Sequence, residues 1–551
     1  MNPVDPITVS VIQHRLTAIV AEMGEAMLRT SYSQILNSSR DFSTAICDRH
    51  SRLVAQAEHI PIHVGALTFA AESISESFAD TVRAGDVYLL NDPYFGGSHL
   101  PDVTAFVPVF AGDELLFWTI NRAHHSDIGG ATHGAYNPTA TSIFQEGLRI
   151  PPLKLYDRGT LREDLLEMIA VNTRHPRDFK GDLAAQIGSV HGGERRLHAL
   201  VAEFGAETVK TSVETILESA EQQSRAVIAS WPDGVYHGSA MLDDDGHGRS
   251  DVTIRATVTK SGSDLEVDLT GSDPQSAGFV NSSYANMRSA VAMAIAYLID
   301  PQTPKNHGSF LPISVKAQQG TIVWSHDGAP VTMCTSHCSN EICEAIVVAL
   351  SQACPERAMG GWGRRLRVAI QGENPKTGSE FIWHMFHARP GAGGSSGGDG
   401  WHNSGEWHSA GGLKFGSVEL AEARFPLYFR RHEFRTDSAG DGEYRGGAGV
   451  ELELVLETQD RSLANTAGDG SRYGSRGMAG GTDSMPHHYW IERTDGTVRE
   501  LSTKEILVPV DPGDTLVAHS AGGGGWGDPA RRSAAARARD ELNGIVSPGQ
   551  R

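Results

Sequence analysis

Apolar and polar residues follow two different periods along the chain, and these periods predict both helices and strands. After Asp5-Pro6, a favourable helix start, five apolar residues recur at helical spacing: Ile12, Leu16, Ile19, Met23 and Met27. This pattern predicts a long amphipathic helix whose apolar side packs on a core. Comparable spacing predicts further helical segments at 63–83, 181–230, 287–299, 341–353 and 531–543.

Short runs rich in β-formers, separated by turn residues, predict antiparallel strands. The runs 103–110 and 115–120 flank a four-residue loop, the runs ending at 47 and starting at 53 flank another turn, and 235–273 alternates as a meander. The glycine-rich loops 389–400 and 522–529 lack the Lys-Ser/Thr pair of a phosphate-binding loop, which favours close backbone packing. We therefore predict a mixed α+β, multidomain fold of β-hairpins and meanders with packed helices.

The length of 551 residues is enough for several domains. Trp231-Pro232-Asp233-Gly234 marks a break after the long helical segment. We predict an N-terminal α+β domain at 1–230, a central β-meander with helices at 231–430, and a C-terminal β-rich domain with a terminal helix at 431–551.

Composition narrows the class of partner. A formal net charge of −20 disfavours nucleic acid and anionic membrane surfaces, since both require a basic footprint. The N-terminus has no basic and apolar signal pattern, and the longest apolar run, 290–299, is too short to cross a bilayer. Five cysteines, an odd number, fit reduced thiols, so we expect a cytoplasmic protein with buried free thiols even at Cys334–Cys343, whose spacing matches no zinc motif.

The hairpin at 103–120 brings candidate chemistry to its open end. If Phe110 pairs with Leu115, Asp102 faces Ala123 and His124 lies next to it, with His99 just before the first strand. Imidazoles and carboxylates that converge in this way suit zinc, manganese or iron. The alternative is a polar loop with ordinary turn residues.

The same counting for the hairpin at 42–56 places Asp41 opposite Glu58, beside His59. Asp41 either pairs with Arg40 or caps a turn, or it completes the metal site. The choice stays open on spacing alone.

Several longer motifs carry a family resemblance. They are SSRDFSTAICD, AQAEHIPIHVGAL, NDPYFGGSHLPD, FQEGLRIPP, GDLAAQ, YRGGAG and GGGGWGDP, and they extend over essentially the whole chain. In this order they resemble the hydantoinase B family, which includes the B-type half of 5-oxoprolinase, ATP-dependent N-methylhydantoinases and caprolactamase, and the matching subunit of acetone and acetophenone carboxylases.

The resemblance implies a set of site residues and partners. It implies a divalent metal, zinc or manganese, held by Asp41, His99, Asp102 and His124, with Asp92 and Asn91 close by in an outer shell. It also implies an A-type partner with an actin-like fold that binds ATP, an (αβ)2 heterotetramer, and possible use of bicarbonate.

The expected activity is ATP-dependent opening of a cyclic amide such as a hydantoin, a lactam or 5-oxoproline. His125, Glu58 or His59 is the candidate general base. The first alternative is a subunit of an ATP-dependent ketone carboxylase, whose family counterparts are longer and bring an extra small subunit. The second is a non-catalytic scaffold for the ATPase partner, which predicts no bound metal.

Overall fold

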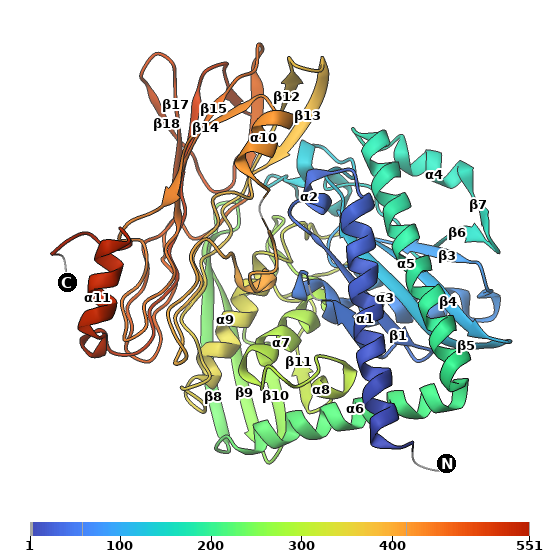
Figure 1. The fold of residues 1–551 in the computed structure, drawn as a ribbon. Helices are drawn as coiled ribbons and strands as arrows, with labels where there is room; N and C mark the ends of the chain where they lie inside the picture. The colour runs from blue at the N-terminus through green and yellow to red at the C-terminus, as the bar shows by residue number, and fades with distance from the viewer. Residues whose placement is uncertain (1–3, 58, 415, 550–551) are drawn as a thin grey trace.

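The computed structural model describes residues 4–57, 59–414 and 416–549 (Figure 1). Its first helix, α1 (Pro6–Thr30), begins where the sequence predicts, because the Asp5 carboxylate accepts hydrogen bonds from the backbone N–H groups of Ile7 and Thr8 at 3.1 and 3.0 Å. The apolar residues at helical spacing are buried. The predicted mixed α+β fold is confirmed.

An antiparallel sheet forms the centre of the N-terminal part, with strand order β2-β1-β5-β4-β3-β6-β7. Its strands are β1 (Phe42–Asp48), β2 (Leu53–Ala57), β3 (Val87–Leu90), β4 (Asp102–Ala111), β5 (Glu114–His124), β6 (Leu153–Asp157) and β7 (Thr160–Leu161). Apolar side chains of α1 and of α5 (Pro176–Phe204) pack on one face, and those of α3 (Pro61–Phe78) pack on the other. Short helices α2 (Gln34–Asn37) and α4 (Glu163–Ala170) lie at the periphery (Figure 1).

The helical segment predicted at 181–230 is two helices, α5 and α6 (Ala206–Ala229). They are separated by Gly205, whose φ of 82° interrupts the helical backbone. Glycine adopts this positive φ without the strain that a side chain would bring, so the chain can change direction there.

The central segment forms the predicted meander and a helical layer on it. Strands β8 (Gly234–Asp244), β9 (Ser250–Ser261) and β10 (Asp264–Asp268) are antiparallel, and β11 (Ile313–Lys316) joins β10 in parallel. Helices α7 (Tyr284–Leu298) and α9 (Cys338–Leu350) are almost wholly buried, and α8 (His307–Phe310) is one short turn. Their apolar residues share one core with this sheet.

The C-terminal part contains two further sheets, β13-β12-β16-β19 and β14-β15-β20-β17-β18. Their bounds are β12 (Val368–Asn374), β13 (Ser379–His384), β14 (Leu427–Phe434), β15 (Val450–Leu456), β16 (Ser462–Thr466), β17 (His488–Glu492), β18 (Val498–Glu500), β19 (Val508–Val510) and β20 (Thr515–His519), with helix α10 (Val418–Arg424) beside β14. Because β12 pairs with β16, one sheet joins strands from both sides of residue 430. The three-domain division at 230 and 430 stays a prediction.

The two glycine-rich loops pack against each other, backbone on backbone. Gly394 N donates to Gly524 O at 2.9 Å, and a Cβ on Gly523 would lie 1.8 Å from the carbonyl oxygen of Ala392. No side chain larger than hydrogen fits between such backbones. The prediction of close backbone packing is confirmed.

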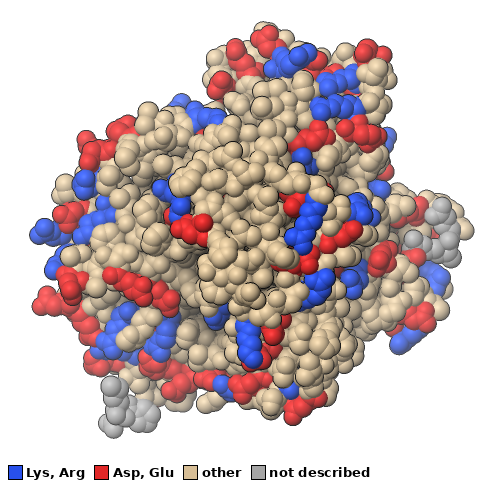
Figure 2. All heavy atoms as spheres, turned by 180° about the vertical axis from the view of Figure 1, so that it is seen from behind, with Lys and Arg blue, Asp and Glu red and all other residues tan. Residues whose placement is uncertain are grey.

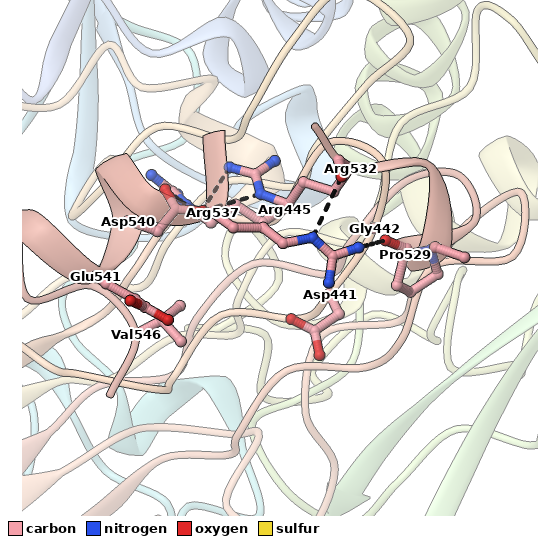
Figure 3. A pocket seen from close by; sticks show the side chains of 10 residues that line it. Asp441, Gly442, Arg445, Pro529, Arg532, Arg537, Asp540, Glu541 and Val546 are labelled. Carbon is pink, nitrogen blue, oxygen red and sulfur yellow. Dashed lines mark hydrogen bonds and ion pairs between the residues drawn. The ribbon is translucent and has the colours of Figure 1, made fainter. Parts of the chain in front are cut away.

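The last helix, α11 (Ala534–Leu542), docks on the C-terminal part beside a pocket of about 190 Å³ that is lined by charged side chains (Figure 3). Asp540 accepts from Arg445 Nε at 2.9 Å and lies 2.7 Å from Arg532 Nη2. Arg532 also donates to Asp399 at 2.7 Å. Since these charges compensate one another, the pocket explains how the helix docks and does not indicate a reaction site.

Two predicted strand registers are wrong, and each pairing contains a β-bulge. Phe110 does pair with Leu115, but a β-bulge follows, and Asp102 pairs with His124 and not with Ala123. In the other hairpin the predicted count pairs Thr44 with Ala55, whereas Thr44 pairs with Ala57. One position of this shift comes from the turn, where Cys47 pairs with Leu53 and not with Arg52, and the other comes from the irregularity between Ile46 and Cys47. Counting from the turn assumes a ladder without extra residues, and a bulge adds one.

All five cysteines lie within the described residues and are buried free thiols, as predicted. Among the described helices, none has both the length and the apolar character needed to cross a bilayer. On the face seen in Figure 2, Lys and Arg are interspersed with Asp and Glu.

Candidate metal centre

Three donor atoms converge at one edge of the N-terminal sheet. His99 Nε2 lies 2.9 Å from Asp102 Oδ1, His124 Nδ1 lies 3.1 Å from the same oxygen, and the two nitrogens are 3.1 Å apart. All three side chains are buried, at 5%, 0% and 3% exposure. Within the described part of the chain, this is the group of His, Cys, Asp and Glu residues whose ligand atoms lie close enough to share a metal ion.

Neighbouring strands bring these residues together. β1, β5 and β4 are adjacent and antiparallel, so the start of β4, the end of β5 and the start of β1 meet at one edge. Asp102 pairs with His124, and the N–H of His124 donates to the carbonyl of Asp41 at 3.0 Å. Residues directly opposite in an antiparallel pair point to the same face, so Asp41, His124 and Asp102 form a row across three strands.

The backbone orients the His99 ring. His99 Nδ1 donates to the carbonyl of Thr332, which can only accept, so Nε2 presents its lone pair to Asp102 and His124. The buried Glu146 carboxylate accepts from the N–H groups of Val331 at 2.8 Å and of Thr332 at 2.9 Å, and thereby holds that carbonyl in position. Support of this kind is typical of the residues around metal ligands.

Sequence reasoning missed His63. It lies in the first turn of α3, with Nε2 3.3 Å from Asp102 Oδ2 and 3.8 Å from Asp41 Oδ1. It therefore links the two carboxylates. The motif AQAEHIPIHVGAL contains the pattern that predicts this position, because Pro61 starts a helix and a side chain in the first turn points towards the strand ends. Of the two histidines in this motif, only His59 was predicted as a site residue.

Burial and the neighbouring charges shift the pKa values of the side chains in the cluster. Burial opposes ionisation of Asp102, but the neighbouring His99 and His63 hold the pKa of its carboxyl well below the ordinary value. Burial likewise opposes protonation of His99, and the Asp102 carboxylate outweighs it and raises the pKa of the imidazole. For His63 burial dominates and lowers the pKa. The Asp102 carboxylate is thus favoured in its ionised form, and the neighbouring His63 imidazole in its neutral form.

Asp41 is buried at the rim of this cluster, 5% exposed. The preceding residue, Arg40, has a φ of 58°, a left-handed conformation that is uncommon for a residue with a side chain. This turn connects α2 to β1 and directs Asp41 towards His63. Strained backbone of this kind concentrates at functional sites.

The remaining predicted residues lie outside the cluster. His125 points to the opposite side of the sheet, where its Nε2 lies 2.8 Å from Gln186 Oε1, and burial lowers its pKa. His59 packs against Phe42 with the rings tilted by 57° and their centroids 4.6 Å apart, and burial lowers its pKa to about 4. Glu58 lies outside the described residues.

Asn91 and Asp92 organise the loop that carries His99. The Asn91 side chain donates to the carbonyls of Leu100 at 2.7 Å and Leu148 at 2.9 Å. Asp92 accepts from Arg149 Nε at 2.8 Å. Both residues act on the shape of the loop, at a distance from the three converging donors.

The residues present fit a divalent cation. Ligands at the usual 2.0–2.1 Å from zinc in a tetrahedron lie roughly 3.3 Å apart, close to the observed donor separations. His99 follows the usual pattern of a metal-binding histidine, because its second nitrogen donates to the Thr332 carbonyl. His124 departs from that pattern, because its Nε2 is buried without a hydrogen-bond partner among the described residues. The mixed nitrogen and oxygen donor set suits zinc and manganese alike.

Comparisons with known proteins agree with this architecture. Residues 5–529 match the family model for hydantoinase B/oxoprolinase. The chain is 35% identical to the caprolactamase subunit beta of Pseudomonas jessenii over 99% of its own length and 95% of the relative's length.

Two solved structures share the fold. The crystal structure of the ATP-dependent caprolactamase from P. jessenii superposes with a TM-score of 0.93 at 34% identity, covering 99% of this chain and 95% of that one. Nucleotide-free acetone carboxylase gives a TM-score of 0.89 at 20% identity, covering 99% and 78%, which shows a common fold. From the family match, the identity and the first superposition, this chain belongs to the hydantoinase B/oxoprolinase family.

Proposed function

We propose that this chain is the metal-binding B-type subunit of an ATP-dependent enzyme that opens a cyclic amide such as a lactam, a hydantoin or 5-oxoproline. The observation that carries the proposal is the buried convergence of His99 Nε2, Asp102 Oδ1 and His124 Nδ1 within about 3 Å of one another. A scaffold has no need of such a cluster, because burying unpaired polar groups costs stability.

The proposed ligands are Asp41, His99, Asp102 and His124, and the metal is zinc or manganese. A divalent cation bound there supplies Lewis-acid activation of an acyl oxygen or of water. The relative with 35% identity is named as a subunit, and the corresponding solved structure is named as ATP-dependent, which supports an A-type partner that binds ATP. An (αβ)2 assembly is part of the proposal.

The side chains of this chain have separate tasks in the proposed reaction. Asp102 remains ionised and keeps the two imidazoles oriented, since its pKa is held low. His63 spans Asp102 and Asp41 and holds or passes a proton between them at Nε2. ATP is needed because an unstrained cyclic amide resists opening, and phosphorylation of the amide oxygen creates a leaving group. The general base stays a prediction among His125, Glu58 and His59, of which His125 lies on the other side of the sheet from the cluster.

The test uses the chain purified with its partner. The complex is incubated with ATP and a panel of caprolactam, hydantoin and 5-oxoproline, while ADP and the released amino acid are measured and metal content is determined in parallel. We expect product from at least one cyclic amide, about one metal per chain, and loss of both in His99→Ala. Bicarbonate fixation into a ketone, with no amide opened, would contradict the proposal in favour of a carboxylase.

A further inference from the structure

A buried arginine beside the metal centre has no anionic partner. Arg367 is 1% exposed, and its guanidinium carbon lies 4.1 Å from the ring centroid of Phe386 and 5.1 Å from that of Tyr136. Its Nε and Nη1 have no hydrogen-bond partner among the described residues, and no described carboxylate lies within ion-pair distance. An uncompensated buried charge is costly, which points to a missing anion.

Arg365 adds a second positive charge to the same place. It is 6% exposed, its Nη1 lies 3.1 Å from His408 Nε2, and its Nε has no partner in the described part of the chain. The nearest carboxylate, Glu406, is 3.8 Å away and is already bound by Arg389 at 2.6 Å. Arg365 and Arg389 therefore share one carboxylate, and Arg367 adds a further buried positive charge, so the surroundings are cationic.

The strand geometry makes the two arginines neighbours. Asp469 and Ala467 donate from their backbone N–H groups to the carbonyls of Arg365 and Arg367, so the chain is extended and already paired before β12 begins. Residues two apart in an extended chain lie on one face, and Ala369 continues that face. Ala369 pairs with His384 of β13, which belongs to the same face of the hairpin.

This face is turned towards the metal centre. The ring centroids of Tyr136 and His384 are 5.4 Å apart, edge to face, and the Tyr136 hydroxyl and both His384 nitrogens have no partner among the described residues. His384 lies close enough to His124 for the two rings to interact electrostatically. The unpartnered polar atoms thus form a continuous row from the metal ligand His124 to Arg367.

A surface groove reaches this row. It has a volume of about 300 Å³ and runs between the N-terminal part and the β12–β13 hairpin, with exposed Glu380, half-buried Ser126 and buried His384 in its lining. His384 is the residue of the row that lines the groove. A volume of this size accommodates a small metabolite.

We propose that Arg365, Arg367, Tyr136 and His384 form an oxyanion-binding subsite next to the metal centre. It takes the carboxylate of a cyclic amino-acid amide, or the phosphoryl group of the activated species. The planar guanidinium fork matches either group, and the tyrosine hydroxyl donates one further hydrogen bond. The inference rests on the proposed function, because it names the group of the substrate that is held while the amide is opened.

The test measures anion binding directly, with activity kept as a separate readout. Inorganic phosphate and acetate are each titrated by calorimetry into the full-length chain, its Arg367→Met and Tyr136→Phe variants, and the control Arg431→Met, an exposed arginine on β14. We expect saturable binding of one anion to the wild type and the control. Binding should be weakened about 10- to 100-fold in Arg367→Met, the usual effect of losing hydrogen bonds to a charged group. Binding of acetate would indicate that the subsite holds the substrate carboxylate, and binding of phosphate would indicate that it holds the phosphoryl group.

Thermal unfolding supplies a readout that a purely structural arginine would not change. Arg367→Met removes an unpaired buried charge, so the variant should fold. Its Tm should no longer rise with the anion that stabilises the wild type. Equal anion binding in Arg367→Met and wild type, or no saturable binding of either anion, would overturn the subsite. Anion binding without opening of any cyclic amide would instead reject the proposed function and leave the subsite standing.

Discussion

Asp102 and His124 are direct cross-strand partners, and Asp102 Oδ1 lies 3.1 Å from His124 Nδ1. A β-bulge opposite Val109 and Phe110 creates this pairing, because Leu116 on β5 is left without a partner on β4. With the register counted from the turn, Asp102 and His124 would have pointed to opposite faces of the sheet, because neighbouring positions alternate. One extra residue near the turn thus brings the two side chains onto the same face.

Replacing His124 should empty the metal centre. His124→Ala removes one of three converging donors and leaves the buried Asp102 carboxylate without that partner. Metal content, measured by elemental analysis, and turnover with ATP should each fall by at least about 100-fold, beyond the effect of an outer-shell change. The control is His488→Ala, an exposed histidine on β17 that pairs with Glu500. Full metal content in His124→Ala would contradict the ligand assignment.

Replacing His63 should weaken the centre without emptying it. His63→Asn removes the link between Asp102 and Asp41 but none of the three converging donors. Metal affinity, measured by competition with a chelator, should fall about 10- to 100-fold. An unchanged affinity would show that His63 does not position the carboxylates. A complete loss, equal to that of His124→Ala, would make His63 a ligand itself.

The C-terminal helix should detach when Asp540 is replaced. Asp540→Ala leaves Arg445 and Arg532 without a carboxylate that both contact, in a partly buried pocket (Figure 3). Removing one partner of such a charge network lowers the free energy of unfolding by about 3 kcal/mol. Limited trypsin digestion should then cleave the arginine-rich segment 531–539 much faster than in wild type. Glu433→Ala, an exposed position on β14, is the matched control, and equal digestion rates in both variants would refute this role of Asp540.

Acid should destabilise the protein through histidines that are buried in neutral form. Burial, with a smaller effect of the nearby charge of His432, lowers the pKa of His387 from 6.5 to about 4. Between these values the unfolded state binds more protons, so the stabilisation is complete above pH 6.5 and is lost as the pH falls towards 4. His387→Phe keeps an aromatic ring against Trp383 and Phe429. On acidification its free energy of unfolding should fall by about 3 kcal/mol less than that of the wild type. Chemical denaturation at pH 7 and pH 4 measures the difference, and parallel losses in variant and wild type would rule it out.

Local patterns predicted many of the elements and several features of the site. The Asp5 cap and the spacing of Ile12 to Met27 depend only on neighbouring residues, so α1 begins where predicted. The hairpin at 103–120 and the presence of His99, Asp102 and His124 at its end follow from strand and turn composition. The general-base candidates were less predictable, since His125 lies on the other side of the sheet against Gln186, a contact with a helix more than sixty residues away.

The sequence by itself determined the fold class, the family and the residue types available for chemistry, because periodicity and motif order are properties of neighbouring residues. Only the tertiary structure decided the register that aligns Asp41, His124 and Asp102, the entry of His63 from α3, and the row of unpartnered groups that ends at Arg367. These depend on bulges and on contacts between segments hundreds of residues apart, and their energies come from burial and packing, which no local pattern encodes.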